Sequence, residues 1–221
     1  MRIDFVSDVA CPWCAIGFSA LERALERIGG DVREVELHVQ PFELNPTMEP
    51  DGEDATEYLT SKYGMSREQF AANRARIVER GAAEGFEFGP RTHIWNTFDA
   101  HRLLFFAGAE GAPGSQRALK HALLKAYHGQ GRNPGARDVL LELAGRVGLP
   151  VDRARDVLER GEYADNVREA ERFWQEIGIH SVPAVIVNRK HLISGGQPNA
   201  VFEQALRQIA AEPDGAATQR G

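Results

Sequence analysis

The only two cysteines of the 221-residue chain, Cys11 and Cys14, lie three residues apart in the stretch S-D-V-A-C-P-W-C-A-I-G at residues 7–17. Two thiols at this spacing can bind a metal, form a structural disulfide, or exchange electrons with other thiols. They can also be small buried side chains that came together by chance. The rest of the sequence distinguishes among these alternatives.

Metal binding would need more ligands than the sequence offers. Structural zinc sites usually complete a C-x2-C pair with a second close pair of cysteines or histidines, and iron–sulfur clusters generally take four cysteines. The chain has no third cysteine, and its seven histidines include no H-x3–5-H pair. We therefore expect no metal site.

The setting of the two cysteines favours redox chemistry. Pro12 directly follows Cys11, and proline is preferred at the first position of a helix. Cys11 would then lie near the N-cap, where its sulfur faces the free N–H groups of Trp13 and Cys14 and the positive end of the helix dipole. Both effects stabilise a thiolate. Cys14 follows one turn later on the same helix face, where it can resolve a mixed disulfide.

Composition and charge exclude several classes of partner. The formal net charge is −6 and no run of five basic residues occurs, which argues against a nucleic-acid partner. The longest apolar runs, such as residues 103–109, are too short to cross a membrane. The first eight residues contain two acids and no apolar segment typical of a secretory signal. We therefore expect a cytoplasmic protein, in which a structural disulfide is rare.

The first 45 residues predict a β-α-β unit. A short strand at residues 3–6 precedes an amphipathic helix at residues 12–28, which Gly29 and Gly30 end. Apolar and polar residues then alternate over residues 35–40, which is typical of a half-buried strand.

The far end of the chain predicts a β-β-α unit. Residues 184–187 form a fully apolar run, and a short polar turn separates it from residues 191–194, so we expect a hairpin. Pro198 then opens a last helix with Phe202, Leu206 and Ile209 on one face.

The segment between these units is predicted to be helical. We find no convincing strand in residues 47–163, and the helical patterns span residues 54–62, 66–84, 96–110, 115–128, 136–147 and 152–160. Ser66 and Gln69 form a candidate capping box, and a further helix covers residues 163–177. The expected α/β architecture is thus β-α-β, an all-helical insertion, then a helix and β-β-α. Its parts are residues 1–46 with 164–212, the insertion at 47–163, and a polar tail at 213–221.

Two further residues have open interpretations. Pro183 precedes the apolar run at residues 184–187, and it either begins that strand with an ordinary trans bond or forms a cis Val182–Pro183 bond beside the thiols. Asp8 is three residues before Cys11. We favour a loop residue that caps the strand end, and the alternative is a carboxylate that tunes the thiol or moves protons.

The chain resembles the DsbA-like branch of the thioredoxin superfamily, and most closely its FrnE-like cytoplasmic members. The resemblance rests on C-P-W-C after a strand, V-P before a hairpin and the helical segment between them. The stretches N-T-F-D-A-H-R-L at 96–103 and S-G-G-Q-P at 194–198 are also similar to family motifs. The resemblance implies a thioredoxin-like fold interrupted by a helical insertion, with Cys11 as nucleophile, Cys14 as resolving thiol and Pro183 in cis. Many relatives have glycine where this chain has Ser181.

The candidate substrate groove includes five further residues, which are Pro12, Trp13, Val182, Asn96 and His101. Trp13 would shield the cysteines and offer an apolar contact. We expect Asn96 to cap a helix, with Asp99 bonding back, and His101 to be half-buried. The alternative is that Asn96 and His101 are polar contacts facing the groove near the thiols.

We therefore predict a thiol–disulfide oxidoreductase that acts on protein or small-molecule thiols and disulfides, as a monomer or homodimer. No cofactor is expected beyond the Cys11–Cys14 couple, with glutathione as a candidate reductant. One rival is a kappa-type glutathione transferase or 2-hydroxychromene-2-carboxylate isomerase, whose members usually have serine at the position of Cys11. Another is a non-catalytic thiol chaperone or adaptor that grips partners with its helical insertion.

Overall fold

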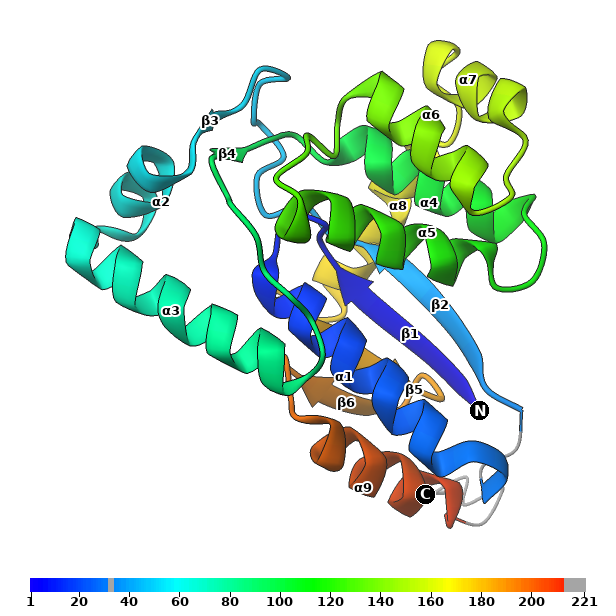
Figure 1. The fold of residues 1–221 in the computed structure, drawn as a ribbon. Helices are drawn as coiled ribbons and strands as arrows, with labels where there is room; N and C mark the ends of the chain where they lie inside the picture. The colour runs from blue at the N-terminus through cyan, green and yellow to red at the C-terminus, as the bar shows by residue number, and fades with distance from the viewer. Residues whose placement is uncertain (32–33, 213–221) are drawn as a thin grey trace.

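The computed structural model describes residues 1–31 and 34–212, so the expected polar tail at 213–221 lies outside it. Four strands form the main sheet in the order β2-β1-β5-β6 (Figure 1). β1 (Arg2–Ser7) and β2 (Glu36–Pro41) are parallel, and α1 (Pro12–Ile28), with a short 3-10 helix at Gly29–Asp31, connects them. The predicted β-α-β unit is confirmed.

The hairpin near the end of the chain completes the sheet. β5 (Ala184–Val187) pairs antiparallel with β1, and β6 (His191–Ser194) pairs antiparallel with β5. α9 (Asn199–Ala210) follows, with Pro198 at its N-cap.

Helices cover both faces of the sheet, which explains why β5 is apolar throughout. α1 and α9 pack together on one face, and α8 (Ala164–Glu176) lies behind the other face in Figure 1. Val185 and Val187 belong to the cluster on the α1 side, whereas Ala184 and Ile186 pack with Trp174 of α8. A strand that is buried on both faces needs apolar residues at every position.

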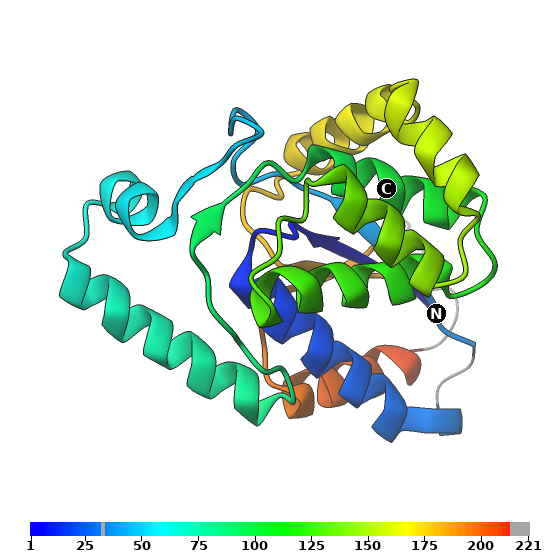
Figure 2. The ribbon, with the colours of Figure 1, turned by 45° about the horizontal axis from the view of Figure 1, so that its top comes forward.

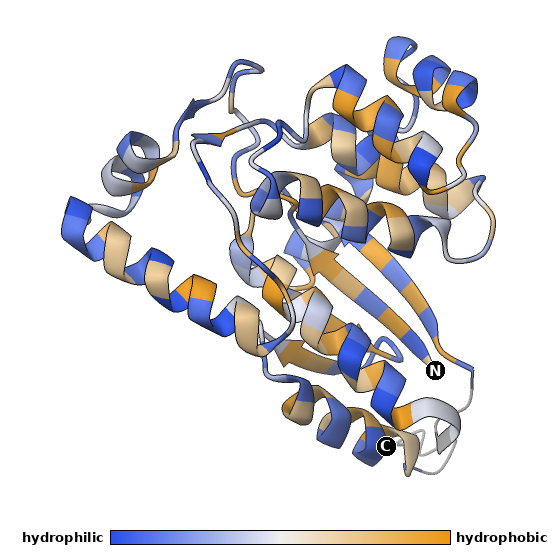
Figure 3. Ribbon diagram, in the orientation of Figure 1, coloured by the Kyte–Doolittle hydropathy of each residue, from blue (hydrophilic) through white to orange (hydrophobic). Residues whose placement is uncertain are grey.

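The segment between the two units is mainly helical, and its helices fall into two groups. The bounds are α2 (Ala55–Tyr63), α3 (Arg67–Ala83), α4 (Phe98–Ala109), α5 (Ser115–Leu124), α6 (Arg137–Arg146) and α7 (Val151–Glu159). α4 and α5 pack against β2, with α6 and α7 packed on them, whereas α2 and α3 extend away from the sheet as an arm (Figures 1 and 2). Hydrophilic residues occur along the whole of α3 (Figure 3). The predicted capping box of Ser66 and Gln69 starts α3 and is confirmed.

Two predictions for this segment were wrong. Two short strands, β3 (Glu53–Asp54) and β4 (His93–Ile94), pair antiparallel although no strand was expected at 47–163. Each strand has only two residues, so it has no detectable alternation of apolar and polar positions. The helix expected at 115–128 ends as α5 at Leu124 and continues as a π-helix, η2 (Lys125–Gly129). A π-helix leaves no simple pattern in the sequence.

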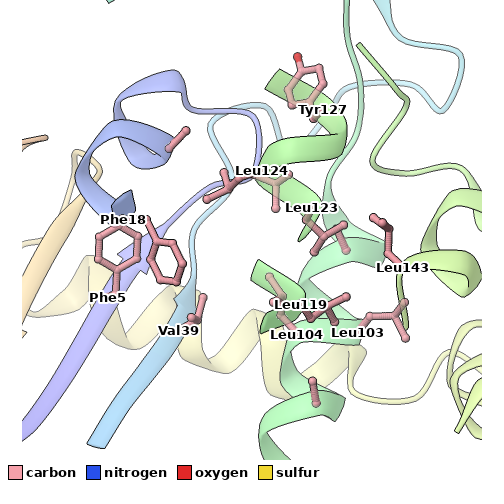
Figure 4. Close-up of a cluster of buried hydrophobic side chains, with 14 of the residues drawn as sticks. Phe5, Phe18, Val39, Leu103, Leu104, Leu119, Leu123, Leu124, Tyr127 and Leu143 are labelled. Carbon is pink, nitrogen blue, oxygen red and sulfur yellow. The ribbon is translucent and has the colours of Figure 1, made fainter. Parts of the chain in front are cut away.

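A single cluster of buried side chains extends from the sheet into the helices. Phe5 of β1 contacts Phe18 of α1 at 5.2 Å between ring centroids, and Val39 of β2 belongs to the same cluster as Leu103 and Leu119 (Figure 4). The cluster is continuous, so it marks no boundary at residue 46 or 164. The division into two domains there stays a prediction. No helix in residues 1–31 and 34–212 is long and apolar enough to span a membrane.

Candidate active site

The start of α1 places both cysteines at the end of β1. Cys11 is the N-cap, in extended conformation with φ −86° and ψ 117°, and Pro12 occupies the first helical position. The backbone N–H groups of Cys14 and Ala15 both donate to the Cys11 carbonyl, at 3.1 and 3.3 Å. The predicted position of Cys11 at the helix start is therefore confirmed.

The two thiols differ in access, and both are free. Cys11 is 4% exposed and lines a cavity of about 490 Å³, whereas Cys14 is fully buried and is not among the residues that line that cavity. A molecule in the cavity can therefore approach Cys11 before Cys14.

The surroundings of Cys11 favour its anion. The Cys14 thiol, which donates toward the Cys11 sulfur, is the main cause of a lowered Cys11 pKa. Burial opposes this shift, as does the charge of Asp8. The backbone N–H groups of Cys14 and Trp13 favour the thiolate, although the sulfur makes no regular capping hydrogen bond. The net effect lowers the pKa of Cys11 below the ordinary cysteine value.

Cys14 has the opposite tendency. Burial is the main cause that raises its pKa, and the neighbouring Cys11 sulfur raises it further. The charge of Lys120 and the backbone of Asp8 act the other way without reversing the shift. Cys11 is thus the first thiol to ionise, and Cys14 keeps its proton.

Pro183 lies directly beside this pair, and the Val182–Pro183 peptide bond is cis. The Cys11 thiol donates to the Val182 carbonyl at 3.7 Å. Gly17 permits this approach, because a Cβ at that position would lie 3.1 Å from Cγ of Pro183 and 3.3 Å from Cα of Gly196. The backbone of the proline segment therefore forms one wall beside the Cys11 sulfur.

Residues of α2 and α3 form one side of the cavity at Cys11. Its lining is mainly apolar with several cationic groups, and comprises Ala10, Cys11, Pro12, Trp13, Leu44, Asn45, Leu59, Tyr63, Met65, Phe70, Asn73, Arg74, Arg76, Ile77, Phe88, Arg91, His128, His180, Ser181 and Val182. Trp13 is 38% exposed, so it offers its ring to an occupant. The structure thus brings together Pro12, Trp13 and Val182, three of the five predicted groove residues.

Asn96 and His101 are not at this cavity, so the alternative of groove-facing contacts near the thiols is not the arrangement found. His101 is 1% exposed, so the expectation of a half-buried side chain was also wrong. Asn96 accepts from the N–H of Phe98 and donates to Met48, but the N-cap of α4 is Thr97. Asp99 pairs with Arg102 instead of bonding back.

Asp8 occupies the loop after β1 and organises it. Its fully buried carboxylate accepts hydrogen bonds from the N–H groups of Ala10 and Leu44 and from the hydroxyl of Thr97. Nε2 of His101 lies 3.3 Å away. Burial raises the pKa of Asp8, but the His101 and backbone contacts together lower it below its ordinary value. These contacts tie the loop that contains Asp8 to the segment after β2 and to the start of α4. They fit the favoured interpretation of Asp8 as a loop residue.

Three residues near the thiols were not found from the sequence. Arg91 donates to the Ala10 carbonyl, His128 contacts the Val9 carbonyl at 2.8 Å, and Lys120 is fully buried. The partners of Arg91 and His128 are distant in sequence, and no local pattern marks Lys120 as buried, so spacing gave no signal for these residues. Across residues 1–31 and 34–212, no group of histidine, cysteine, aspartate or glutamate side chains could hold a metal ion.

Solved structures show the same architecture. The probable DsbA oxidoreductase SCO1869 from Streptomyces coelicolor is 36% identical, with a TM-score of 0.88, over 97% of this chain and 92% of that one. The cytosolic disulfide reductase DsbM from Pseudomonas aeruginosa, with GSH, is 21% identical (TM-score 0.64; 94% of this chain, 100% of that one). A 2-hydroxychromene-2-carboxylate isomerase is 14% identical, with a TM-score of 0.70, over 95% of this chain and 96% of that one. At these two identities the likeness shows the fold alone.

The sequence match covers the same elements that build the site. A family model described as a DSBA-like thioredoxin domain matches residues 2–207, from β1 through the helical segment and the hairpin into α9. With a cysteine pair at the start of the first helix and a strand order of β2-β1-β5-β6, the chain belongs to the DSBA-like thioredoxin domain family.

Proposed function

We propose that this protein is a thiol–disulfide oxidoreductase that uses Cys11 and Cys14 as its redox couple. The observation that carries the proposal is the unequal pair at the start of α1. Cys11 has a lowered pKa and lines the cavity, whereas Cys14 is buried and has a raised pKa. A thiolate that an occupant of the cavity can reach, next to a protonated partner, is the arrangement that disulfide exchange requires.

The reaction proceeds in two exchanges. The Cys11 thiolate attacks one sulfur of a substrate disulfide, which forms a mixed disulfide and expels the first substrate thiolate. Cys14 then attacks the Cys11 sulfur, which forms the Cys11–Cys14 disulfide and expels the second substrate thiolate. Two electrons pass from the protein dithiol to the substrate, and each expelled thiolate takes up one proton. The reverse sequence oxidises a substrate dithiol.

The cis Val182–Pro183 segment and Trp13 would hold the substrate during these exchanges. The Val182 carbonyl lies 3.7 Å from the Cys11 sulfur, so an extended peptide or small disulfide at this wall is in reach of the nucleophile. Pro12 and Trp13 add apolar surface at the same edge of the cavity. The substrates are protein or small-molecule thiols and disulfides, with glutathione a candidate reductant.

We place the reaction in the cytoplasm, where a reducing thiol pool would keep the couple largely as dithiol. The protein would then act on disulfides as a reductase more readily than as a net oxidase.

The test is reduction of insulin disulfides with dithiothreitol as electron donor, for the wild type and for Cys11→Ser and Cys14→Ser. We expect Cys11→Ser to be inactive and Cys14→Ser to accumulate a mixed disulfide with substrate, visible by mass spectrometry. Activity that survives in Cys11→Ser would contradict the proposal and favour an adaptor. Glutathione conjugation that persists in Cys14→Ser, without disulfide reduction in the wild type, would favour a kappa-type transferase or isomerase.

A further inference from the structure

The wall of the cavity at Cys11 is positively charged, although the chain as a whole is acidic. The sequence has 32 aspartates and glutamates against 26 lysines and arginines. The cavity wall nevertheless includes three arginines, Arg74 and Arg76 of α3 and Arg91 of the segment that follows α3. Among the described residues that line the cavity, none is an aspartate or a glutamate. An anion in this cavity would therefore meet positive charge without an acidic side chain on the wall.

Hydrogen bonds fix two of these arginines to backbone groups near Cys11. Arg74 donates through Nη2 to the Gly89 carbonyl at 2.6 Å, which ties α3 to the segment between α3 and β4. Arg91 of that segment donates to the Ala10 carbonyl at 2.8 Å, directly before Cys11. Figure 1 shows this segment running along α1. Because both guanidinium groups are already anchored, an anion would not have to order two free side chains.

Both anchored arginines keep N–H groups for a ligand. A guanidinium group has five N–H donors. Within residues 1–31 and 34–212, Arg74 uses only Nη2, and Arg91 uses only Nη2 and Nε, the latter toward the Tyr127 hydroxyl. In the same part of the chain neither arginine forms an ion pair with a carboxylate. Half-buried arginines with free donors bind planar carboxylates well, because two N–H groups can donate to the two oxygens.

The rest of the wall suits an apolar body of small-molecule size. Phe70, Arg74 and Ile77 follow each other at i, i+4 and i+7, so they share one face of α3, and all three line the cavity. Phe88 and the half-exposed Trp13 add aromatic surface. The volume of about 490 Å³ lies in the range typical of small-molecule sites. The cavity therefore offers cationic groups and apolar surface to the same occupant.

We propose that the substrates of this site are small disulfides that combine a carboxylate with an aromatic or similarly bulky apolar body, an inference that rests on the proposed function. The carboxylate binds Arg74 and Arg91, and the apolar body lies against the cavity-facing side of α3 and Trp13. Glutathione disulfide has carboxylates but no apolar body, so it meets only half of this requirement. The exchange itself is the one given above. The Cys11 thiolate displaces one substrate thiolate, and Cys14 then displaces the other.

Four disulfides separate the carboxylate from the apolar body. Ellman's reagent is aromatic and anionic, dithiodipyridine is aromatic and uncharged, dithiodipropionate is aliphatic and anionic, and cystamine is aliphatic and cationic. The rate constant for oxidation of the reduced protein by each would be measured by quenched flow and mass spectrometry near neutral pH. Each value is divided by the rate constant of mercaptoethanol with the same disulfide, because leaving groups differ in reactivity. We expect the ratio for Ellman's reagent to exceed the other three by about tenfold or more.

Substitutions in α3 test the role of the charge. Arg74→Met should lower the ratio for Ellman's reagent about tenfold, because charge-assisted hydrogen bonds are lost, and change the ratio for dithiodipyridine by less than about twofold. Arg74→Glu should also raise the ratio for cystamine, which a general defect in folding would not do. Arg67→Met removes an exposed arginine of the same helix outside the cavity wall and should match the wild type. Arg76→Met, exposed on the wall, replaces Arg74→Met if that variant does not fold, with a loss of about threefold.

The proposal is overturned if a folded Arg74→Met protein, or Arg76→Met in its place, slows equally with Ellman's reagent and dithiodipyridine, or with neither. It is also overturned if the wild type reacts with all four disulfides at similar ratios. That result would leave the proposed function intact. A wild type that reacts with none of the four would instead overturn the proposed function, and this inference with it.

Discussion

Asp8→Asn tests whether the buried carboxylate holds the loop that carries Cys11. One oxygen accepts from the N–H of Ala10 at 3.0 Å and from the Thr97 hydroxyl at 2.8 Å, and the other accepts from the N–H of Leu44 at 2.7 Å. An asparagine has one acceptor oxygen, so its NH2 group would face one of these donors. Leaving a buried donor unpaired costs about 1–3 kcal/mol, and the remaining hydrogen bonds become weaker because their acceptor is no longer charged.

We expect the Asp8→Asn substitution to lower the free energy of unfolding by about 3 kcal/mol. With a urea slope of about 2 kcal/mol per molar, the midpoint should fall by about 1.5 M. Asp152→Asn is the matched control, because Asp152 is almost fully exposed and pairs with Arg155 across one helical turn. That control should change the free energy of unfolding by less than about 0.5 kcal/mol.

The Asp8→Asn substitution should also change the pKa of Cys11. The charge of Asp8 raises the pKa of Cys11, so its removal should lower that pKa further. A less stable protein with a more acidic Cys11 is the expected combination. An unchanged unfolding midpoint, or a Cys11 pKa that rises, would refute the reasoning.

The pH dependence of the Asp8 contribution follows from its lowered pKa in the folded protein. An unfolded aspartate ionises at about pH 3.9, so the folded state gains stability from Asp8 above that pH. This gain should disappear as the pH falls through the folded-state value. Urea curves of the wild type and Asp8→Asn should therefore converge as the pH is lowered below about 4.

Three further substitutions have direct readouts. Phe18→Ala, which removes a buried ring packed on Phe5, should lower the free energy of unfolding by about 3–5 kcal/mol in urea; a loss below about 1 kcal/mol would contradict this packing. Ser66→Ala should cost about 1 kcal/mol through the lost capping box, without changing Cys11 alkylation rates. Trp13→Ala should leave stability within about 1 kcal/mol but raise KM for aromatic disulfides; an unchanged KM would show that the exposed ring does not contact substrate.

The parts of the fold that the sequence predicted correctly have strong local signals. The strand at 3–6, the helix that starts at Pro12 and the hairpin around residues 188–190 each combine periodicity with a proline, glycine or polar turn. The capping box at Ser66 is likewise a contact between neighbours in the chain. Local patterns are visible in a sequence because both partners lie within a few residues.

The features that the sequence did not predict depend on distant partners. β3 and β4 are two residues long and pair across about 40 residues, so their alternation cannot be recognised. Asp8 and His101 are 93 positions apart, and nothing in the spacing indicates that they meet. Lys120 is polar and looks like a surface residue in its helix, yet it is fully buried. Tertiary packing, and not local preference, determines each of these outcomes.

The most direct test of the account is a pH titration of the two thiols in the reduced wild-type protein. Thiolate absorbance in the ultraviolet gives the pKa values, and alkylation with mass spectrometry assigns each one to a cysteine. The account predicts a first transition below the ordinary cysteine value of about 8.5 that belongs to Cys11, with Cys14 ionising well above it. A first transition at or above that value, or one that belongs to Cys14, would contradict the proposed mechanism.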